Sequence, residues 1–177
     1  TATTYALGDL QKSGSAHGIP VIGVIDPGVQ AALQQTTGHV GVIGTEGTIR
    51  GGEYKRLLMA QNTDIQVTQH ACPLFVALAE EGWTDGEVAE AVALRYLKGL
   101  QNGPDTLILG CTHYPLLANA IATVLPGVTL VDSATSTAKA VSNALTHNGL
   151  TSTVGTGQNR FLVTDNKERF TRVGTRF

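Results

Sequence analysis

One stretch constrains the fold of this chain more than any other, because residues 107–115 read LILGCTHYP. The β-branched and apolar residues 106–109 are bounded by turn-forming residues on both sides, which is typical of a short strand buried on both faces of a parallel sheet. Pro115 suits the first position of a following helix, where its missing N–H would have no partner anyway. Cys111 is therefore predicted to lie where the carboxyl end of a strand meets the amino end of a helix. In open α/β sheets, ligands bind in the crevice at that place.

Cys111 and His113 are separated by one residue, and in extended backbone such residues point the same way. Both side chains are then expected to face one site, with the hydroxyl and the backbone N–H of Thr112 between them. A helix amino end favours anions, which here are a substrate carboxylate or the thiolate itself. The plain alternative is a buried, inert cysteine. The strand end, the nearby histidine and the helix start together favour a functional site.

The rest of the sequence alternates between strand-like and helix-like segments. Short apolar or alternating runs predict strands at residues 21–25, 40–43, 64–69, 106–109, 128–131 and 160–164. Helical spacing of apolar residues, with polar caps and glycine stops, predicts helices at residues 1–11, 26–35, 51–61, 73–81, 84–99, 115–124 and 137–148, and a last one capped by Asp165 that turns Phe170 and Val173 inward. This alternation predicts the α/β class with a mostly parallel sheet.

Composition excludes several classes of protein. A length of 177 residues suits one ordinary domain or two small ones. The formal net charge of −2, without a basic block, gives no support for binding to nucleic acid or to an anionic membrane. Two cysteines make no disulfide framework, which favours a reducing cytoplasm, and the printed residues carry neither a signal-peptide pattern nor an apolar run of about 18 residues. The Cys-x-His spacing at residues 111–113 is a weak signal for zinc, and no other metal-ligand spacing is obvious.

A second candidate site is the glycine-rich turn at residues 44–48, GTEGT, between a predicted strand and a predicted helix. Such a turn presents backbone N–H groups and hydroxyls to an anion. It lacks the lysine and the spacing of a phosphate loop, so a small carboxylate is a better match than a nucleotide. The alternative is a plain tight turn in which Thr48 caps the next helix.

The second cysteine, Cys72, is predicted to be a small core residue, because residues 73–76 (PLFV) begin a buried helix. His70 is interpreted as an ordinary loop histidine. Glu80 and Glu81 end the same helix, where a solvent-exposed charge is the plain interpretation of either side chain. We accept that interpretation for Glu81.

Four stretches resemble motifs of the bacterial glutamate racemases. LGCTHYP at residues 109–115 looks like the second catalytic motif of that family, and similar matches occur at residues 41–50 (GVIGTEGTIR), 71–76 (ACPLFV) and 130–134 (LVDSA). The resemblance extends over essentially the whole chain and is highly specific. It implies two Rossmann-like α/β domains with mostly parallel sheets and a substrate cleft between them.

The resemblance also implies that the first of these domains is incomplete here. The family carries a first catalytic motif, Cys-Asn-Thr-Ala, whereas residues 1–4 read TATT, as if the chain began directly after that Cys-Asn. The Asp-Ser and Tyr-Gly motifs of the family's amino-terminal third have no counterpart. We therefore expect residues 1–23 to be a remnant of the first domain, residues 24–132 to form the second, and residues 133–177 to pack on the first. Taken alone, the chain is expected to be inactive or nearly so.

Racemisation of an amino acid requires proton removal on one face of Cα, proton delivery on the other, and a site that holds the carboxylate and excludes water. The resemblance implies that two cysteines do this without pyridoxal phosphate or a metal, and that Cys111 is the second of them. It implies that His113 assists proton transfer at Cys111 and that Glu80 contacts His113. Substrate-binding positions of the family match Thr1, Thr45, Thr48 and Thr112.

The base role of Cys111 requires a thiolate. We expect His113, the helix amino end and nearby N–H groups to lower the pKa of this thiol from its usual value of about 8.5. By resemblance, the substrate is glutamate, D-glutamate serves peptidoglycan synthesis and so cell-wall biogenesis and cell shape, and the protein is a cytoplasmic homodimer.

Two alternatives stay open. A related aspartate or hydantoin racemase, or an enzyme of the maleate isomerase type, also resembles this fold and pairs two cysteines, and it differs in the length of the substrate side chain. A catalytically dead binding or regulatory module is the alternative from another class, because such a protein would also lack the first cysteine.

Overall fold

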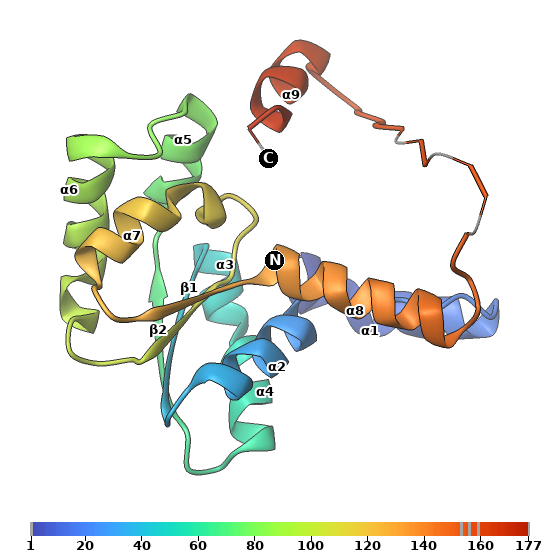
Figure 1. Ribbon diagram of the computed structural model, residues 1–177, viewed down its shortest axis with the longest axis horizontal. Coiled ribbons are helices and arrows are strands. Elements are labelled where there is room, and N and C mark those ends of the chain that lie inside the picture. The colour runs from blue at the N-terminus through green and yellow to red at the C-terminus, as the bar shows by residue number, and fades with distance from the viewer. Residues whose placement is uncertain (1, 153, 156, 159, 177) are drawn as a thin grey trace.

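The computed structural model describes residues 2–152, 154–155, 157–158 and 160–176 of the chain. Its centre is a parallel four-stranded sheet with the order β2–β1–β3–β4 (Figure 1). The strands are β1 (His39–Gly44), β2 (Gln66–Ala71), β3 (Thr106–Leu109) and β4 (Thr129–Asp132). The sequence predicts all four, and the α/β class with a parallel sheet is confirmed.

Helices cover both faces of the sheet (Figure 1). One face is covered by α2 (Ile25–Gln35) and α4 (Glu53–Gln61), and the other by α5 (Leu74–Glu81), α6 (Gly86–Leu97) and α7 (Ala118–Val124). The remaining elements are α1 (Ala2–Ala16), α3 (Glu46–Gly51), α8 (Ser133–His147), α9 (Lys167–Gly174) and the short 3-10 helices η1 (Lys98–Leu100) and η2 (Tyr114–Leu117). Over the described residues, no helix has the length and apolar character needed to cross a membrane.

β3 is the centre of the core because all four of its residues are buried. Leu107 and Leu109 point into the cluster beneath α6 and α7, whereas Ile108 points into the cluster beneath α2 and α4. Alternate residues of a strand face opposite sides, so this one strand serves both clusters. Burial of each such side chain contributes roughly 1.5–3 kcal/mol, which makes the strand a rigid support for the residues that follow it.

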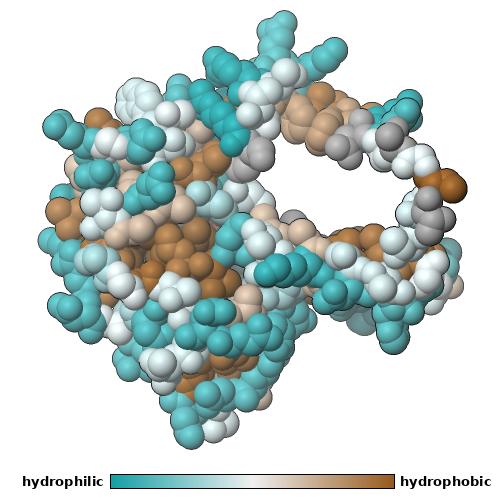
Figure 2. Space-filling view, in the orientation of Figure 1, coloured by the Kyte–Doolittle hydropathy of each residue, from teal (hydrophilic) through white to brown (hydrophobic). Residues whose placement is uncertain are grey.

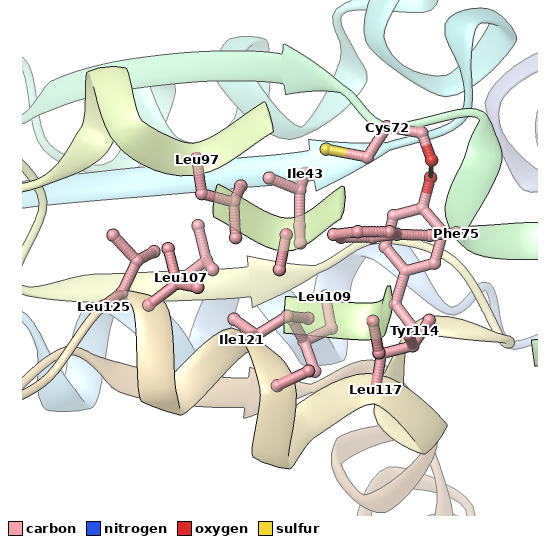
Figure 3. Close-up of a cluster of buried hydrophobic side chains, with 14 of the residues drawn as sticks. Ile43, Cys72, Phe75, Leu97, Leu107, Leu109, Tyr114, Leu117, Ile121 and Leu125 are labelled. Carbon is pink, nitrogen blue, oxygen red and sulfur yellow. Dashed lines mark hydrogen bonds between the residues drawn. The ribbon is translucent and has the colours of Figure 1, made fainter. Parts of the chain in front are cut away.

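Aromatic rings close the core near the end of β2 (Figure 3). Phe75 and Tyr114 meet edge to face, with ring centroids 5.2 Å apart. The hydroxyl of Tyr114 donates a 2.7 Å hydrogen bond to the carbonyl of Cys72, whose side chain is 0% exposed. The prediction that Cys72 is a core residue is confirmed.

A carboxylate holds the amino ends of β1 and β3 together. Asp105 accepts hydrogen bonds from the hydroxyls of Thr36 (2.6 Å) and Thr37 (2.7 Å) and from the backbone N–H of His39 (3.3 Å). Burial opposes ionisation of Asp105, but these donors outweigh it and hold the pKa of this carboxyl well below its usual range. The network joins the loop before β1 to the residue before β3.

Two segments that the sequence predicts as strands are not strands. Residues 21–24 and 160–163 have no regular structure, although both are rich in apolar residues. Within the described part of the chain, neither segment has a neighbouring strand that supplies backbone hydrogen bonds, and an extended segment without such a partner joins no sheet. Phe161 and Leu162 accordingly remain 74% and 83% exposed.

Capping side chains account for differences at two helix boundaries. α8 begins at Ser133, about one turn earlier than expected, because the carboxylate of Asp132 accepts hydrogen bonds from two backbone N–H groups of the first turn. α9 is capped by Asn166 rather than Asp165. Phe170, which was expected to point inward, is 44% exposed.

Candidate active site

The carboxyl ends of β1 and β3 lie at one edge of the sheet, because these strands are parallel neighbours. Ile43 pairs with Leu109, and the N–H of Gly110 donates a 2.8 Å hydrogen bond to the carbonyl of Ile43. A Cβ at Gly110 would lie 2.8 Å from that carbonyl oxygen, so only glycine allows this approach. The turn after β1 and Cys111 after β3 therefore leave the sheet next to each other.

Cys111, His113 and Glu80 form a chain of contacts at this edge. The Sγ of Cys111 lies 3.8 Å from Nδ1 of His113, and Nε2 of His113 lies 3.5 Å from Oε1 of Glu80. Glu80 comes from the last turn of α5, 33 positions before His113 in the sequence. The structure brings these three residues together, and their catalytic roles stay predictions.

The backbone joins Cys111 and His113 in a way that differs from the expectation. Residues 111–113 form a bend and a turn rather than extended strand, and the N–H of Tyr114 closes the turn with a 3.1 Å hydrogen bond to the carbonyl of Cys111. Pro115 lies at the start of η2, and α7 begins only at Ala118. The expectation of an α-helix starting directly at Pro115 is therefore wrong, because the closed turn continues first into a 3-10 helix.

Burial raises the pKa of the Cys111 thiol, because the half-buried sulfur loses solvent that would stabilise a thiolate. Hydrogen bonds from the backbone N–H groups of His113 and Tyr114 and from Thr112 act in the opposite direction but are smaller together. The expectation of a lowered pKa is therefore wrong. The shift makes the thiolate harder to form, and Nδ1 of His113 is the ring nitrogen that lies near the sulfur, at 3.8 Å.

The glycine-rich turn after β1 is a capped helix start. Thr45 is the N-cap of α3, and its hydroxyl accepts a 3.3 Å hydrogen bond from the N–H of Thr48. The two hydroxyls lie 3.1 Å apart, and Thr48 is buried. The capping residue is thus Thr45 and not Thr48, because Thr45 is the one with extended backbone at the helix boundary. Binding of a substrate carboxylate by these two residues stays a prediction.

A cleft of about 700 Å³ opens beside His113. Glu80, Thr112 and His113 line one side, and the other side is formed by α9 and the segment before it, including Phe161 and Phe170. In Figure 2, an opening lies between α8 and α9. Thr1, the remaining predicted substrate-binding residue, lies outside the described residues.

A larger groove, of about 870 Å³, follows β4 between α2 and α8. It contains none of the three residues in the Cys111 chain of contacts, so we place the candidate site at the smaller cleft. Among the residues that the structure describes, no group of three or more His, Cys, Asp or Glu side chains could hold a metal ion.

Two arginines of the carboxyl-terminal region, which sequence reasoning missed, reach the same place. The guanidinium of Arg169 contacts Oε2 of Glu80. Arg176 donates hydrogen bonds to the backbone carbonyls of Ala79 (3.2 Å) and Glu80 (2.6 Å). Arg169 is 89 residues from Glu80, so no local spacing marks the contact. The nearest signal is the repeat of arginines three and four residues apart in the last predicted helix.

Residues 1–141 match the family model described as Asp/Glu/Hydantoin racemase. A glutamate racemase of Geobacter metallireducens is 50% identical over 181 residues, covering 100% of this chain and 66% of that protein. The solved glutamate racemase of Francisella tularensis in complex with D-glutamate superposes with a TM-score of 0.89 at 36% identity, over 98% of this chain and 64% of that one. The solved glutamate racemase of Thermus thermophilus in complex with beta-chloro-D-alanine superposes with a TM-score of 0.87 at 42% identity. That superposition covers 99% of this chain and 64% of the other. The chain thus spans 57–66% of the length of the first three curated relatives.

Proposed function

This chain belongs to the Asp/Glu/hydantoin racemase family, and on that premise we propose that it acts in the interconversion of L- and D-glutamate. The observation that carries the proposal is the chain of contacts from Cys111 through His113 to Glu80. Glutamate is favoured over aspartate because the similar proteins described above are glutamate racemases. The D-glutamate formed would serve peptidoglycan synthesis.

Glu80 selects the position of the proton on the His113 ring. Because Oε1 is an acceptor that faces Nε2, the neutral ring keeps its proton on Nε2 and directs the lone pair of Nδ1 toward Cys111. Nδ1 then accepts the proton of the Cys111 thiol. The resulting thiolate removes the Cα proton from one enantiomer, so an S–H bond forms as the Cα–H bond breaks and its electron pair stays on carbon.

Reprotonation must occur on the opposite face of Cα, from a second acid. Cys72 does not fit that role, because its side chain is fully buried and burial raises its pKa to about 12. His70 packs against Tyr96, with ring centroids 6.0 Å apart, and does not join the Cys111 chain of contacts. The family resemblance implies that the second acid is a cysteine that faces Cys111 across the substrate.

Glutamate carries two carboxylates and an ammonium group, which hydroxyls and N–H groups at the sheet edge would hold. We assign this role to Thr45, Thr48 and Thr112, together with Thr1. We also propose a cytoplasmic homodimer, in which a reducing environment keeps Cys111 as a thiol. In this proposal residues 24–132 form one domain, and residues 1–23 and 133–177 belong to the other.

The test uses the protein as its gene encodes it, with glutamate in heavy water. NMR follows exchange of the α-proton, and optical rotation follows racemisation. We expect glutamate, and not aspartate, to exchange its α-proton and racemise. Cys111→Ser should abolish racemisation and stop exchange from one enantiomer, because a serine hydroxyl is too weak an acid to supply the base. Cys72→Ala is the matched control and should retain both activities. The proposal would be overturned if Cys111→Ser racemised glutamate in both directions at the wild-type rate. It would also be overturned if the protein turned over aspartate in place of glutamate.

A further inference from the structure

Two arginines hold the carboxyl-terminal region against the end of α5, and they contact different parts of Glu80. Arg169 contacts the side-chain carboxylate at Oε2. Arg176 donates to the main-chain carbonyls of Ala79 and Glu80, and its guanidinium lies 2.7 Å from the place where a Cβ on Gly82 would be. Arg176 therefore docks this region on α5 through backbone contacts, independently of the Glu80 carboxylate.

The two oxygens of the Glu80 carboxylate have different partners. Oε2 contacts Arg169, and Oε1 lies 3.5 Å from Nε2 of His113. The Glu80 side chain is 28% exposed, so with a single partner its rotatable bonds would allow the carboxylate to turn into solvent. Arg169 opposes that rotation, because its positive charge holds the Oε2 atom that it contacts.

We propose that Arg169 is a positioning residue for the acid–base pair of this site. It holds Glu80 so that Oε1 accepts the proton of Nε2, which keeps Nδ1 of His113 unprotonated and directed at Cys111. This inference rests on the proposed function, in which Nδ1 accepts the thiol proton. Because Arg169 lies on α9, the choice of which His113 ring nitrogen carries the proton depends on the presence of α9 across the cleft.

The competing interpretation is that Arg169 only helps to dock α9. The Arg169 side chain is 55% exposed, and half-exposed ion pairs contribute little to stability. If docking alone mattered, loss of Arg176 would affect the site at least as much as loss of Arg169, because Arg176 makes two hydrogen bonds to the end of α5. In the positioning role, the Arg169–Glu80 contact persists without Arg176 and keeps the site unchanged. A comparison of the two arginines therefore separates positioning from docking.

The first experiment needs no substrate. In protein labelled with 15N-histidine, the ring nitrogen shifts of His113 at mildly alkaline pH report which nitrogen carries the proton, with His113→Gln assigning the signals. We expect the Nε2–H form in wild type and in Arg176→Gln, and a mixture of both tautomers in Arg169→Gln. Arg169→Lys should restore the Nε2–H form, because its ammonium group still pairs with Oε2.

The second experiment measures racemisation kinetics. We expect Arg169→Gln to lower kcat roughly two- to fivefold with KM unchanged, the size of one half-exposed ion pair, while Arg176→Gln leaves kcat unchanged. An unchanged His113 tautomer in Arg169→Gln, or an equal loss of kcat in Arg176→Gln, would overturn the positioning role. A wild-type protein without glutamate turnover would instead overturn the proposed function, and the tautomer comparison would still decide the role of Arg169.

Discussion

The two ends of β3 hold ionisable groups whose pKa values are shifted in opposite directions. At the amino end, hydroxyl and N–H donors around Asp105 outweigh burial and lower the pKa of its carboxyl. At the carboxyl end, burial of Cys111 outweighs the donors that face the sulfur and raises the pKa of its thiol. Burial disfavours the charged form at both ends, so the balance between burial and the donors that face each group sets the direction in which its pKa moves. The donors at the amino end stabilise the folded chain, whereas the carboxyl end holds the thiol that the proposed function uses.

The largest expected effect concerns the carboxyl end itself, where only one of two cysteines should react. In the folded protein at neutral pH, iodoacetamide is expected to alkylate Cys111 on the order of 10²-fold faster than Cys72, because burial raises the pKa of Cys72 to about 12 and leaves almost no thiolate. Because the pKa of Cys111 is also raised, its rate should still increase with pH beyond the usual thiol range. Peptide mass spectrometry measures both sites, and urea-unfolded protein is the control in which the rates converge. Equal rates in the folded protein would remove the contrast between the two cysteines.

The next effect tests whether the neighbours of Cys111 matter for its chemistry. Glu80→Ala is expected to lower the racemisation rate roughly 10- to 100-fold, because His113 loses the acceptor that orients its ring. Glu81→Ala is the matched control, since this adjacent carboxylate is exposed and should leave the rate unchanged. The two rates are compared at saturating glutamate. Equal rates for the two variants would remove Glu80 from the proposed mechanism.

At the amino end, the expected effect is on stability rather than on activity. Asp105→Asn should lower the free energy of unfolding by about 1–3 kcal/mol at neutral pH, because an amide NH₂ would face donors of Thr36 or Thr37. The pKa of Asp105 is lower in the folded than in the unfolded chain, so its stabilisation is present above the unfolded value of about 3.9. This stabilisation is lost as the pH falls through the folded value. Urea unfolding at neutral and strongly acid pH measures the difference, and a gap that persists in acid would contradict this account.

The smallest expected effect is a change in the free energy of unfolding from a contact near Cys72, apart from the chemistry at Cys111. Tyr114→Phe removes the 2.7 Å hydrogen bond to the Cys72 carbonyl and should lower the free energy of unfolding by about 1 kcal/mol. Tyr5→Phe is the control, because its hydroxyl donates a longer, exposed bond of 3.2 Å to Gly47. Both variants are measured by urea unfolding. Equal changes in stability would mean that burial of the Tyr114 hydroxyl adds nothing.

Local patterns in the sequence predict much of this fold. The four strands, the buried state of Cys72 and the position of Cys111 after β3 all follow from runs of apolar residues and from turn chemistry. The same patterns wrongly predict strands at residues 21–25 and 160–164, because a strand requires a hydrogen-bonding neighbour, which a local pattern does not reveal. They also place the start of α8 too late, because the side-chain cap at Asp132 lets the helix begin at Ser133.

The sequence by itself determined that a buried strand would lead through Gly110 to Cys111 and His113, because strand burial and turn closure act over a few neighbouring residues. The tertiary structure alone decided the direction of the Cys111 pKa, since that direction depends on how much solvent the surrounding elements exclude. It alone also placed Arg169 on Glu80, across 89 residues of sequence. Such a contact forms only when α9 docks against α5, and the packing of two distant surfaces leaves no periodic mark in either segment.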